Sequence, residues 1–363
     1  MNFRQFNMTD TPQQVGLFDT LQHGQQIPAG GGYSKTVLAH TYDDIISVEN
    51  LLAAWKEFLR GKCDRDDVQI FKKRLMSNVL ALHRDLVGGN CKHLKYEAFR
   101  VADPKPRDIH KASVRDRLLH RAIYRKVYSF LDATFIPDSY SCRTGKGMHK
   151  AMNQFRDFGR KESHNHTRTC WVLKCDIRKF FASIDQQILL EIVEQHIAEK
   201  NIRALITEVV GSFSTASGKG LPLGNLTSQL LANVYMNELD QFMKHKIKAK
   251  YYIRYADDFV ILSRDRKWLE TILPQVGDFL WSELRLTLHP DKVSIDTFAA
   301  GVDFLGWVHF PDYRVLRTST KRRMLRRTMG LEKDDPTVQS YLGMISHGNT
   351  RKLSDMVEKR LAR

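Results

Sequence analysis

The 363 residues carry 57 Lys and Arg against 41 Asp and Glu, a formal net charge of +16, and 42% of them are hydrophobic. A chain of this size can bury a large core, and the excess of positive charge favours a polyanionic partner, nucleic acid first and an anionic membrane surface second. No apolar run approaches the ~20 residues of a membrane-spanning helix, and Met1–Phe6 lacks the apolar stretch of a secretory signal, so we expect a cytoplasmic protein without a membrane partner.

The five cysteines are scattered along the sequence and include no Cys-x-x-Cys pair. An odd number without paired spacing argues against a disulfide framework and against a zinc site. We therefore expect reduced thiols, and Cys175, which lies in an apolar run, is expected to be a small core residue.

The N-terminal part of the sequence divides into a polar leader and a series of helical patterns. Residues 1–46 are rich in Gln and Gly, which predicts a flexible leader. From Ser47 onward, and again over residues 68–86, apolar residues recur every three or four positions, which predicts core-facing helices. Residues 95–150 are basic and loop-rich, with a helix predicted to begin near Ser113.

The second half of the sequence alternates strand patterns with helical ones. Cys170–Asp176 is rich in β-forming residues and predicts a strand, while helical patterns fill 184–211. A turn rich in Gly precedes a further predicted helix at 226–244. Tyr251–Leu262 has the pattern of a β-hairpin, and the residues after 311 form a basic helical region.

The sharpest chemical signal is Tyr255–Asp258, in which Asp257 and Asp258 stand between two apolar strand segments. Adjacent carboxylates repel each other, and burial of either one without a partner is costly. A divalent cation relieves both problems, because Mg²⁺ prefers hard oxygen ligands. Taken alone, the motif fits an Asp-Asp turn in solvent as well, so both interpretations stay open at this point.

Asp176, at the end of the earlier predicted strand, strengthens the case for a cation. Nucleotidyl transfer uses two metal ions about 3.5–4 Å apart, and carboxylates on two neighbouring strands can bridge them. A strand-end Asp followed by a distant Asp-Asp hairpin supplies such a set. The alternative for Asp176 is an ordinary helix N-cap, which leaves the other features unlinked.

Three segments, Asp176–Phe181, Gly220–Gln229 and Tyr255–Asp258, fall in the order of the palm motifs of reverse transcriptases, which the sequence resembles from about residue 47 onward. The resemblance implies an α+β right-hand polymerase fold. After the flexible leader it implies N-terminal helices and fingers at 47–170, a palm at 171–310 that includes the helices at 184–211 and the turn at 214–224, and a basic helical thumb at 311–363.

The resemblance also assigns a metal site. It implies that Asp176 and Asp257 hold two Mg²⁺ ions, which Mn²⁺ can replace, that Ile177 belongs to the metal site, and that Asp258 assists as a catalytic residue. Lys292 matches a lysine on the phosphate side or a proton donor, although a solvated strand-end lysine fits equally. Gly301–Gly306 resembles the primer-grip hairpin that ends the palm.

Several residues are implied to bind the incoming nucleotide. The resemblance places the ring of Phe181 under the sugar, where it would clash with a 2′-hydroxyl and so select deoxynucleotides. It places Arg107 and Lys111 in the fingers stretch that grips the triphosphate, where charge-assisted contacts are strong. The remaining implied nucleotide-binding residues belong to the turn segment and are Leu223, Gly224 and Gln229.

Basic residues elsewhere are candidates for nucleic-acid contacts. Arg143 and Lys146 flank a Gly-rich turn, although each fits a solvated or backbone-pairing charge as well. The thumb run alternates basic with apolar residues, which predicts a helix with one face packed and one face on the nucleic-acid backbone. Its implied nucleic-acid-binding residues are Arg317, Lys321, Arg322, Arg323, Arg326 and Arg327.

Leu221–Gln229 carries the signal for the subtype. Most bacterial reverse transcriptases have Gln before this Gly and Pro after this Ser, whereas this sequence has Leu223 and Gln229. This departure resembles the enzymes of diversity-generating retroelements, which copy a template RNA with errors at adenine. An aliphatic side chain removes a polar contact to the nascent base pair, and apolar contacts discriminate weakly.

We therefore expect an RNA-directed DNA polymerase, a nucleotidyltransferase that binds template RNA, the cDNA or primer strand and deoxynucleoside triphosphates. The resemblance also implies a small, basic, oligomeric accessory protein. The alternatives are a defence-associated or group II intron-like reverse transcriptase, an RNA-templated RNA polymerase and a non-catalytic RNA-binding scaffold.

Overall fold

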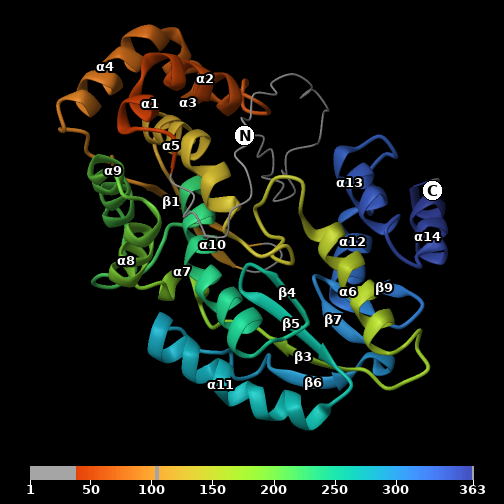
Figure 1. Cartoon of the computed structure of the whole chain (residues 1–363). Helices are drawn as coiled ribbons and strands as arrows, with labels where there is room; N and C mark the ends of the chain where they lie inside the picture. Colours follow the sequence, from red (N-terminus) through yellow and green to blue (C-terminus); the bar gives the residue numbers. More distant parts are fainter. Residues whose placement is uncertain (1–37, 103–105, 362–363) are drawn as a thin grey trace, which may run out of the picture. The chain divides into compact units, whose positions relative to one another are not determined.

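The computed structural model describes residues 38–102 and 106–361 (Figure 1), and the chain divides into two compact units. The first unit holds the described residues up to Phe135, together with Cys142–Gly145 and Phe181–Asn237. The second unit holds Ile136–Ser141, Lys146–Phe180 and the residues from Glu238 onward. The predicted palm is thus divided, because residues 181–237 pack with N-terminal helices. The assignment to fingers, palm and thumb stays a prediction.

The first unit is mainly helical and contains one two-stranded antiparallel sheet, formed by β1 and β2. Its elements in chain order are α1 (Tyr42–Ile46), α2 (Val48–Phe58), α3 (Asp66–Lys73), α4 (Leu75–Val87), β1 (Glu97–Val101), β2 (Arg107–Lys111), α5 (Val114–Asp132), α8 (Gln186–His196) and α9 (Lys200–Gly211). Two further helices run across the division of the chain, α7 (Phe180–Ser183) and α10 (Leu226–Gln241).

The second unit contains a four-stranded sheet in the order β4-β5-β3-β6 and a three-stranded sheet in the order β7-β8-β9. Its elements are α6 (Met148–Glu162), β3 (Trp171–Cys175), the π-helical turn η1 (Phe242–Lys246), β4 (Tyr251–Tyr255), β5 (Asp258–Ser263), α11 (Arg266–Leu284), β6 (Ser294–Thr297), the 3₁₀ turn η2 (Phe298–Ala300), β7 (Val302–Phe304), β8 (Trp307–His309), β9 (Arg314–Leu316), α12 (Thr318–Arg327), α13 (Pro336–Ile345) and α14 (Arg351–Leu361).

Most of the predicted elements are confirmed. Tyr251–Leu262 forms the β4–β5 hairpin, the strand near residue 171 is β3, and the helix predicted near Ser113 is α5, with Ser113 as its N-cap. No disulfide joins any of the five cysteines, and Cys175 is buried, as expected. No helix within the described ranges combines the length and the apolar character that crossing a bilayer requires.

The predicted end of the leader at residue 46 is wrong within the described residues. Thr41 and Asp44 form a capping box around α1, since each side chain accepts a hydrogen bond from the backbone N–H of the other. Ile45 and Ile46 are buried, and the backbone N–H of Tyr42 donates to the Glu199 carboxylate at 2.9 Å. A helix of five residues is too short to show a periodic pattern. Residues 1–37 of the leader lie outside the described residues.

The prediction that residues 95–150 are loop-rich is also wrong. The segment contains the β1–β2 hairpin and α5, a helix of 19 residues. The helix was predicted and the hairpin was not, and many charged residues of the segment pair with acidic residues of the first unit rather than lie in loops. Arg125, for example, donates to Asn50 and forms an ion pair with Glu57.

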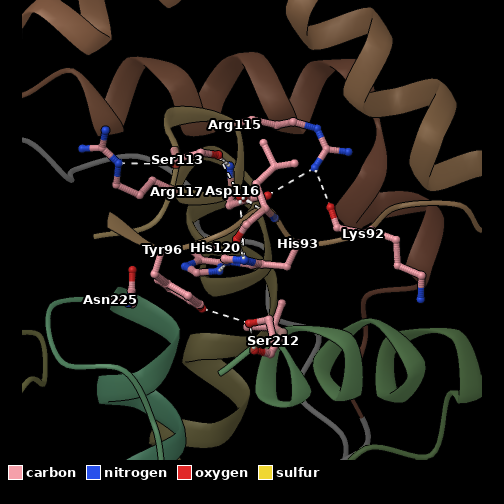
Figure 2. A network of polar contacts seen from close by, with 12 residues as sticks. Lys92, His93, Tyr96, Ser113, Arg115, Asp116, Arg117, His120, Ser212 and Asn225 are labelled. Carbon is pink, nitrogen blue, oxygen red and sulfur yellow. Dashed lines mark hydrogen bonds and ion pairs between the residues drawn. The ribbon is translucent and has the colours of Figure 1, made fainter. Parts of the chain in front are cut away.

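A buried carboxylate organises the start of α5 (Figure 2). Asp116 is fully buried and accepts hydrogen bonds from the hydroxyl of Ser113 at 2.7 Å, the backbone N–H of Leu94 at 3.1 Å and the guanidinium of Arg115 at 3.2 Å. The carboxylate thus joins the chain that leads into β1 to the first turn of α5. A buried charge is tolerated only with such partners.

Two histidine side chains, those of His93 and His120, contact each other beside Asp116. His93 Nδ1 lies 2.7 Å from the carbonyl oxygen of Leu94, which can only accept, so Nδ1 carries the proton and Nε2 accepts. The donor to His93 Nε2 is therefore His120 Nε2, at 3.2 Å. Burial, and after it the neighbouring His93, lowers the pKa of His120 to about 3. The two rings stack with centroids 5.2 Å apart, so the pair is a packing contact.

In the second unit, the four-stranded sheet is covered by helices. α6 contacts β4 and β5, and α11 contacts β5 and β6 (Figure 1). On the α6 side, alternate strand residues such as Val172, Val260 and Leu262 join Phe155 of α6 in one apolar cluster. Because side chains alternate along a strand, the next residues on this face continue the same row toward the β4–β5 turn.

We predict that Asp116→Ala lowers the free energy of unfolding by about 3–5 kcal/mol, because Arg115 and the Leu94 N–H lose a buried partner. Urea unfolding at pH 7 measures the change. The matched control is Asp85→Ala, which removes the other, half-exposed carboxylate partner of Arg115 and should cost no more than about 1 kcal/mol. Equal losses in the two variants would contradict the organising role of Asp116.

Candidate active site

The register of the four-stranded sheet brings two of the predicted aspartates together. β3 and β5 run antiparallel with Cys175 opposite Phe259, so the next pair along consists of Asp176 and Asp258. Alternation places Lys174, Asp176 and Asp258 on the same face as Val172 and Leu262. One face of the sheet therefore changes from an apolar row, packed under α6, to a carboxylate pair at its end. Asp257 lies in the turn that joins β4 to β5.

The carboxylates interact strongly with one another. The pKa of Asp258 is raised to about 7, chiefly by burial and next by the charge of Asp257. The Lys174 ammonium opposes this rise, and Asp176, which is hydrogen-bonded to Asp258, adds to it. Two carboxylates that share a proton indicate a site with more negative charge than the surrounding protein compensates.

Lys292 supplies part of that compensation. Its ammonium lies 2.7 Å from Asp176 Oδ1, and Asp176 itself is only 8% exposed. The segment before Lys292 also holds the backbone of the site, since the N–H of His289 donates to the carbonyl oxygen of Asp176 at 2.7 Å and the N–H of Arg178 donates to the carbonyl oxygen of Thr287. Lys292 therefore lies beside Asp176, and its role toward phosphate or as a proton donor stays a prediction.

The three aspartates offer suitable ligands for a divalent cation, but their side chains are not arranged as a complete metal site. Among the described residues, no three His, Cys, Asp or Glu side chains are gathered closely enough to form a ready metal site. Asp176, Asp257 and Asp258 nevertheless supply hard oxygen ligands around one sheet end, and Lys292 stands where positive charge is required. Ile177 is buried, and its backbone forms an isolated antiparallel β-bridge with that of Leu288. Its membership of the metal site stays a prediction.

A buried ion pair supports the turn that carries Asp257. Arg254 on β4 is fully buried and donates to both oxygens of Asp240 on α10, Nε to Oδ1 at 2.8 Å and Nη2 to Oδ2 at 2.6 Å. The remaining guanidinium hydrogens reach the Ser139 hydroxyl at 3.0 Å and the carbonyl oxygen of Ala256 at 3.2 Å. Burial by itself lowers the pKa of Arg254, but Asp240 reverses this and leaves it raised.

The Arg254 contact matters because the turn is strained. Ala256 has φ of +56°, in the left-handed region that residues with a Cβ rarely occupy. The hydroxyl of Tyr252, two residues before Arg254, donates to Asp240 Oδ1 at 2.7 Å, the oxygen that also accepts from Arg254 Nε. The strand, the helix and the turn are therefore joined through a single guanidinium, which holds Ala256 and hence the two aspartates that follow it.

The predicted nucleotide-binding turn lies in the first unit, where β2 holds it. The N–H of His110 donates to the carbonyl oxygen of Leu223 at 3.3 Å, and the Asn225 amide donates to the carbonyl oxygen of His110 at 3.1 Å. Gly224 has φ of +99°, and a Cβ there would lie 3.1 Å from Ile109. Only glycine meets both requirements. Gln229 lies half-buried in the first turns of α10.

Phe180 and Phe181 are neighbours that differ in exposure. Phe180 is 3% exposed and belongs to the core, whereas Phe181 remains partly exposed at the start of α7. The carbonyl oxygen of Phe181 accepts from the N–H of Leu221 at 2.8 Å, which joins the backbone of Phe181 to the predicted nucleotide-binding turn. Selection against the 2′-hydroxyl stays a prediction.

Several predicted contact residues are already paired within the protein. Lys111 forms ion pairs with Asp67 at 2.9 Å and Glu97 at 3.3 Å. The largely buried Arg143 pairs with Asp132, and Lys146 donates to the carbonyl oxygen of Pro137. These contacts stabilise the fold, and binding of nucleotide or nucleic acid by these residues stays a prediction, as it does for the exposed Arg107 on β2.

The predicted thumb helix is α12, which begins at Thr318. The apolar side of the helix packs through the buried Met324. Four of the predicted nucleic-acid-binding residues lie on the helix with exposed or partly exposed side chains: Lys321, Arg322, Arg323 and Arg326. Arg327 is half-buried, and Arg317 precedes the helix and forms an ion pair with Asp303. The one-sided packing is confirmed, and the contact with nucleic acid stays a prediction.

The sequence analysis missed the pair of Arg254 and Asp240. A signal was present, since Arg254 lies between Ile253 and Tyr255 in an apolar strand, and a charge in such a strand requires a buried partner. The identity of the partner was not predictable, because Asp240 lies on a helix and shares no pattern with the strand.

Comparison with known proteins identifies related sequences. The family model described as "Reverse transcriptase (RNA-dependent DNA polymerase)" matches residues 102–309. Protein YkfC of Escherichia coli is 26% identical over 284 residues, which covers 65% of this chain and 72% of YkfC. The group II intron-encoded protein LtrA of Lactococcus lactis is 22% identical, which covers 57% of this chain and 44% of LtrA.

Other relatives are longer proteins as well. The putative COX1/OXI3 intron 2 protein of Saccharomyces cerevisiae is 20% identical, and the match covers 70% of this chain and 36% of that protein. The chain therefore spans less than half the length of these intron-encoded relatives. Among solved structures, apo telomerase from Candida tropicalis gives a TM-score of 0.46 at 12% identity and covers 60% of this chain and 47% of that one.

We predict that Asp258→Asn stabilises the metal-free protein increasingly from pH 5 to pH 8. The pKa of Asp258 is about 7 in the folded chain and about 3.9 in an unfolded one, so between these values the folded state binds more protons. The free energy of unfolding then falls as pH rises, and Asn, which cannot ionise, avoids this loss. Thermal melts in EDTA measure the difference in Tm, and a difference independent of pH would contradict it.

We predict that Arg254→Lys lowers the rate of nucleotide addition by about tenfold or more. Lysine keeps the charge but cannot donate to Asp240, Ser139 and the Ala256 carbonyl at once, so the turn relaxes. Single-turnover primer extension measures the rate, and Arg266→Lys, at an exposed ion pair on α11, is the control. A wild-type rate in Arg254→Lys would show that the guanidinium does not position the turn.

Proposed function

Because the chain belongs to the reverse transcriptase family and has its α+β right-hand polymerase fold, we propose that it copies an RNA template into DNA at the sheet end that carries Asp176, Asp257 and Asp258. The observation that carries the proposal is the pairing of Asp176 with Asp258 on adjacent strands, with Asp257 in the neighbouring turn. Template RNA, the cDNA or primer strand and deoxynucleoside triphosphates are its proposed partners. We place it in the cytoplasm.

In this proposal the three carboxylates hold two Mg²⁺ ions, which Mn²⁺ can replace. The bound ions would activate the primer 3′-hydroxyl and neutralise charge on the triphosphate. The protein's own part is to place the carboxylates: the β3–β5 register sets Asp176 opposite Asp258, and Arg254 holds the turn before Asp257. Lys292, already at Asp176, is suited to donate a proton or to face a phosphate.

Selection of deoxynucleotides is assigned to Phe181. Its ring is partly exposed, and its carbonyl oxygen accepts from the N–H of Leu221, two residues before Leu223. An aromatic ring at the sugar excludes a 2′-hydroxyl by steric conflict. This favours synthesis of DNA over synthesis of RNA.

We infer that the enzyme is of the diversity-generating type, error-prone at template adenine. The support is Leu223, whose carbonyl is fixed by β2 while its side chain stays half-exposed and offers no hydrogen bond. A wrong base pair then loses little relative to a correct one. A small basic accessory protein belongs to this proposal.

A group II intron-like enzyme is the second candidate. It is favoured by relatives named for introns, LtrA and the yeast COX1 intron 2 protein, which match 57% and 70% of this chain. At identities of 20–22%, these relatives do not determine the subtype, which rests on the turn residues and on experiment. Accurate copying of adenine would support this candidate.

We predict that Asp257→Asn lowers DNA synthesis by about 100-fold or more while RNA binding stays near wild type. Loss of one ligand removes charge stabilisation worth several kcal/mol from the transition state, whereas RNA affinity depends mainly on basic residues. Primer extension with Mg²⁺ or Mn²⁺ and a filter-binding assay measure the two effects. The control is Asp278→Asn, an exposed aspartate on α11. Wild-type synthesis in Asp257→Asn would remove this carboxylate from the site.

We predict that Leu223→Gln lowers errors at template adenine more than at the other three bases, because the amide restores a hydrogen bond that rewards a correct pair. Deep sequencing of cDNA made on one RNA with all four bases measures the spectrum. Leu226→Gln, a half-exposed leucine three residues later, controls for the chemical change. Faithful copying of adenine by the wild type would refute the subtype and leave the polymerase assignment intact.

A further inference from the structure

Two cavities of the second unit have similar volumes but differently balanced charges. The first, about 550 Å³, is lined by Trp171 and by arginines that already have carboxylate partners, since Arg264 pairs with Glu162 and Arg266 with Glu270. The second, about 520 Å³, is lined by Arg156, Phe310, Asp312, Tyr313, Arg314 and the loop 346–349. We call the second cavity the β8–β9 pocket.

The two arginines of the β8–β9 pocket differ in their partners, since Arg156 forms an exposed ion pair with its neighbour Asp157 at 3.5 Å, whereas Arg314 contacts only uncharged acceptors. Arg314 donates to the carbonyl oxygen of His347 at 2.5 Å and to the Asn153 amide oxygen at 3.1 Å, and both acceptors are uncharged. No ion pair joins Arg314 to a carboxylate in the described part of the chain. Burial lowers the pKa of Arg314, and the nearby charge of Arg156 lowers it further. Two guanidinium groups that repel each other at one cavity favour an anion between them.

An aromatic pair lies beside these arginines. The rings of Phe310 and Tyr313 stack with centroids 4.8 Å apart, and 47% of Tyr313 remains exposed. Phe310 is held in place, because a Cβ on Gly301 would lie only 2.6 Å from its ring. An exposed ring on a fixed support next to cations is the arrangement that binds a base and its phosphate.

The opposite wall of the pocket is equally fixed. The N–H of Asn349 donates to the carbonyl oxygen of Arg314 at 2.9 Å, and Gly348 packs so closely on Trp307 that a Cβ would lie 2.0 Å from the indole. The loop therefore cannot move without breaking contacts with β8 and β9. A pocket formed before its ligand arrives loses little entropy on binding.

We propose that the β8–β9 pocket binds one nucleotide of a single-stranded nucleic acid, with its phosphate between Arg156 and Arg314 and its base on Tyr313. The pocket lies at the end of β8 opposite the Gly306 turn, which belongs to the predicted primer grip, so it is a separate site. Binding there requires neither metal nor turnover. The proposal therefore stands or falls independently of the polymerase chemistry.

Crosslinking tests the location directly. The full chain, in EDTA, is irradiated with single-stranded RNA or DNA 12-mers that contain 5-iodouracil, and the adducts are mapped by mass spectrometry. We expect adducts on Tyr313 or Phe310. If the RNA 12-mer binds more tightly than the DNA 12-mer, the occupant of the pocket is the template RNA. If the two bind equally, the pocket recognises the phosphate and base that RNA and DNA share. Adducts elsewhere, with none on these two rings, would overturn the proposal.

Binding of the same 12-mers to variants tests the contacts. Arg156→Ala should flatten the dependence of log affinity on log salt by about 0.7, the effect of one phosphate contact to a single strand. Tyr313→Ala should weaken binding by about fivefold or more. Asp312→Asn should strengthen it, because the exposed Asp312 carboxylate at the rim repels phosphate. Arg314 is left intact, since it also holds the loop.

Matched controls separate these effects from general charge and folding. Lys161→Ala removes one exposed charge from the same helix as Arg156, and Trp281→Ala removes an exposed aromatic ring from α11. Both should bind as the wild type does apart from a small loss common to any removed charge, and all variants should melt within a few degrees of it. Losses in Arg156→Ala and Tyr313→Ala no larger than those of the controls would overturn the proposal.

Discussion

The buried ion pair of Arg254 and Asp240 is the interaction on which the catalytic arrangement depends. One guanidinium joins a strand, a helix and the turn before the paired aspartates, and all of its contacts are inside the protein. Such a pair contributes little net stability, because desolvation offsets its attraction. Its value lies in geometry: a planar fork with fixed donors permits one orientation, and an apolar side chain in its place would leave the strained turn free to relax.

The β3–β5 register converts that local order into a chemical site. Along one face of the sheet the side chains change from apolar residues to carboxylates within two residue pairs, so the aspartates stand on a rigid apolar base. The same burial that fixes their positions penalises their charge, as the raised pKa of Asp258 shows. Without a cation, the charges of these carboxylates destabilise this end of the sheet, and such electrostatic strain is common at functional sites.

The sequence was sufficient for the features that repeat or cluster locally. The hairpin at 251–262 and the helix after Ser113 follow from the alternation of apolar residues and from the capping residue. It was insufficient where a partner is distant in the chain, as with Asp240, or where a basic segment forms a short hairpin, as with β1 and β2. The leader boundary failed because one short capped turn has no period. The pairing of Lys111 and Arg143 with acidic residues was likewise invisible, since charge alone does not distinguish a ligand from a structural partner.

The contact between Lys292 and Asp176 has a consequence for how the protein rests between reactions. With its ammonium 2.7 Å from Asp176 Oδ1, Lys292 acts as an internal counterion, so the cation-free chain does not hold a fully repulsive cluster. In the proposed mechanism, a metal ion would compete with this lysine, and the cost of displacing the ammonium would lower the apparent affinity for the metal. The phosphates of a nucleotide would offer the displaced lysine a new partner and so reduce that cost. The pairing would thus favour binding of metal and nucleotide together over binding of metal alone, a form of cooperativity that arises from one side chain with two alternative anions.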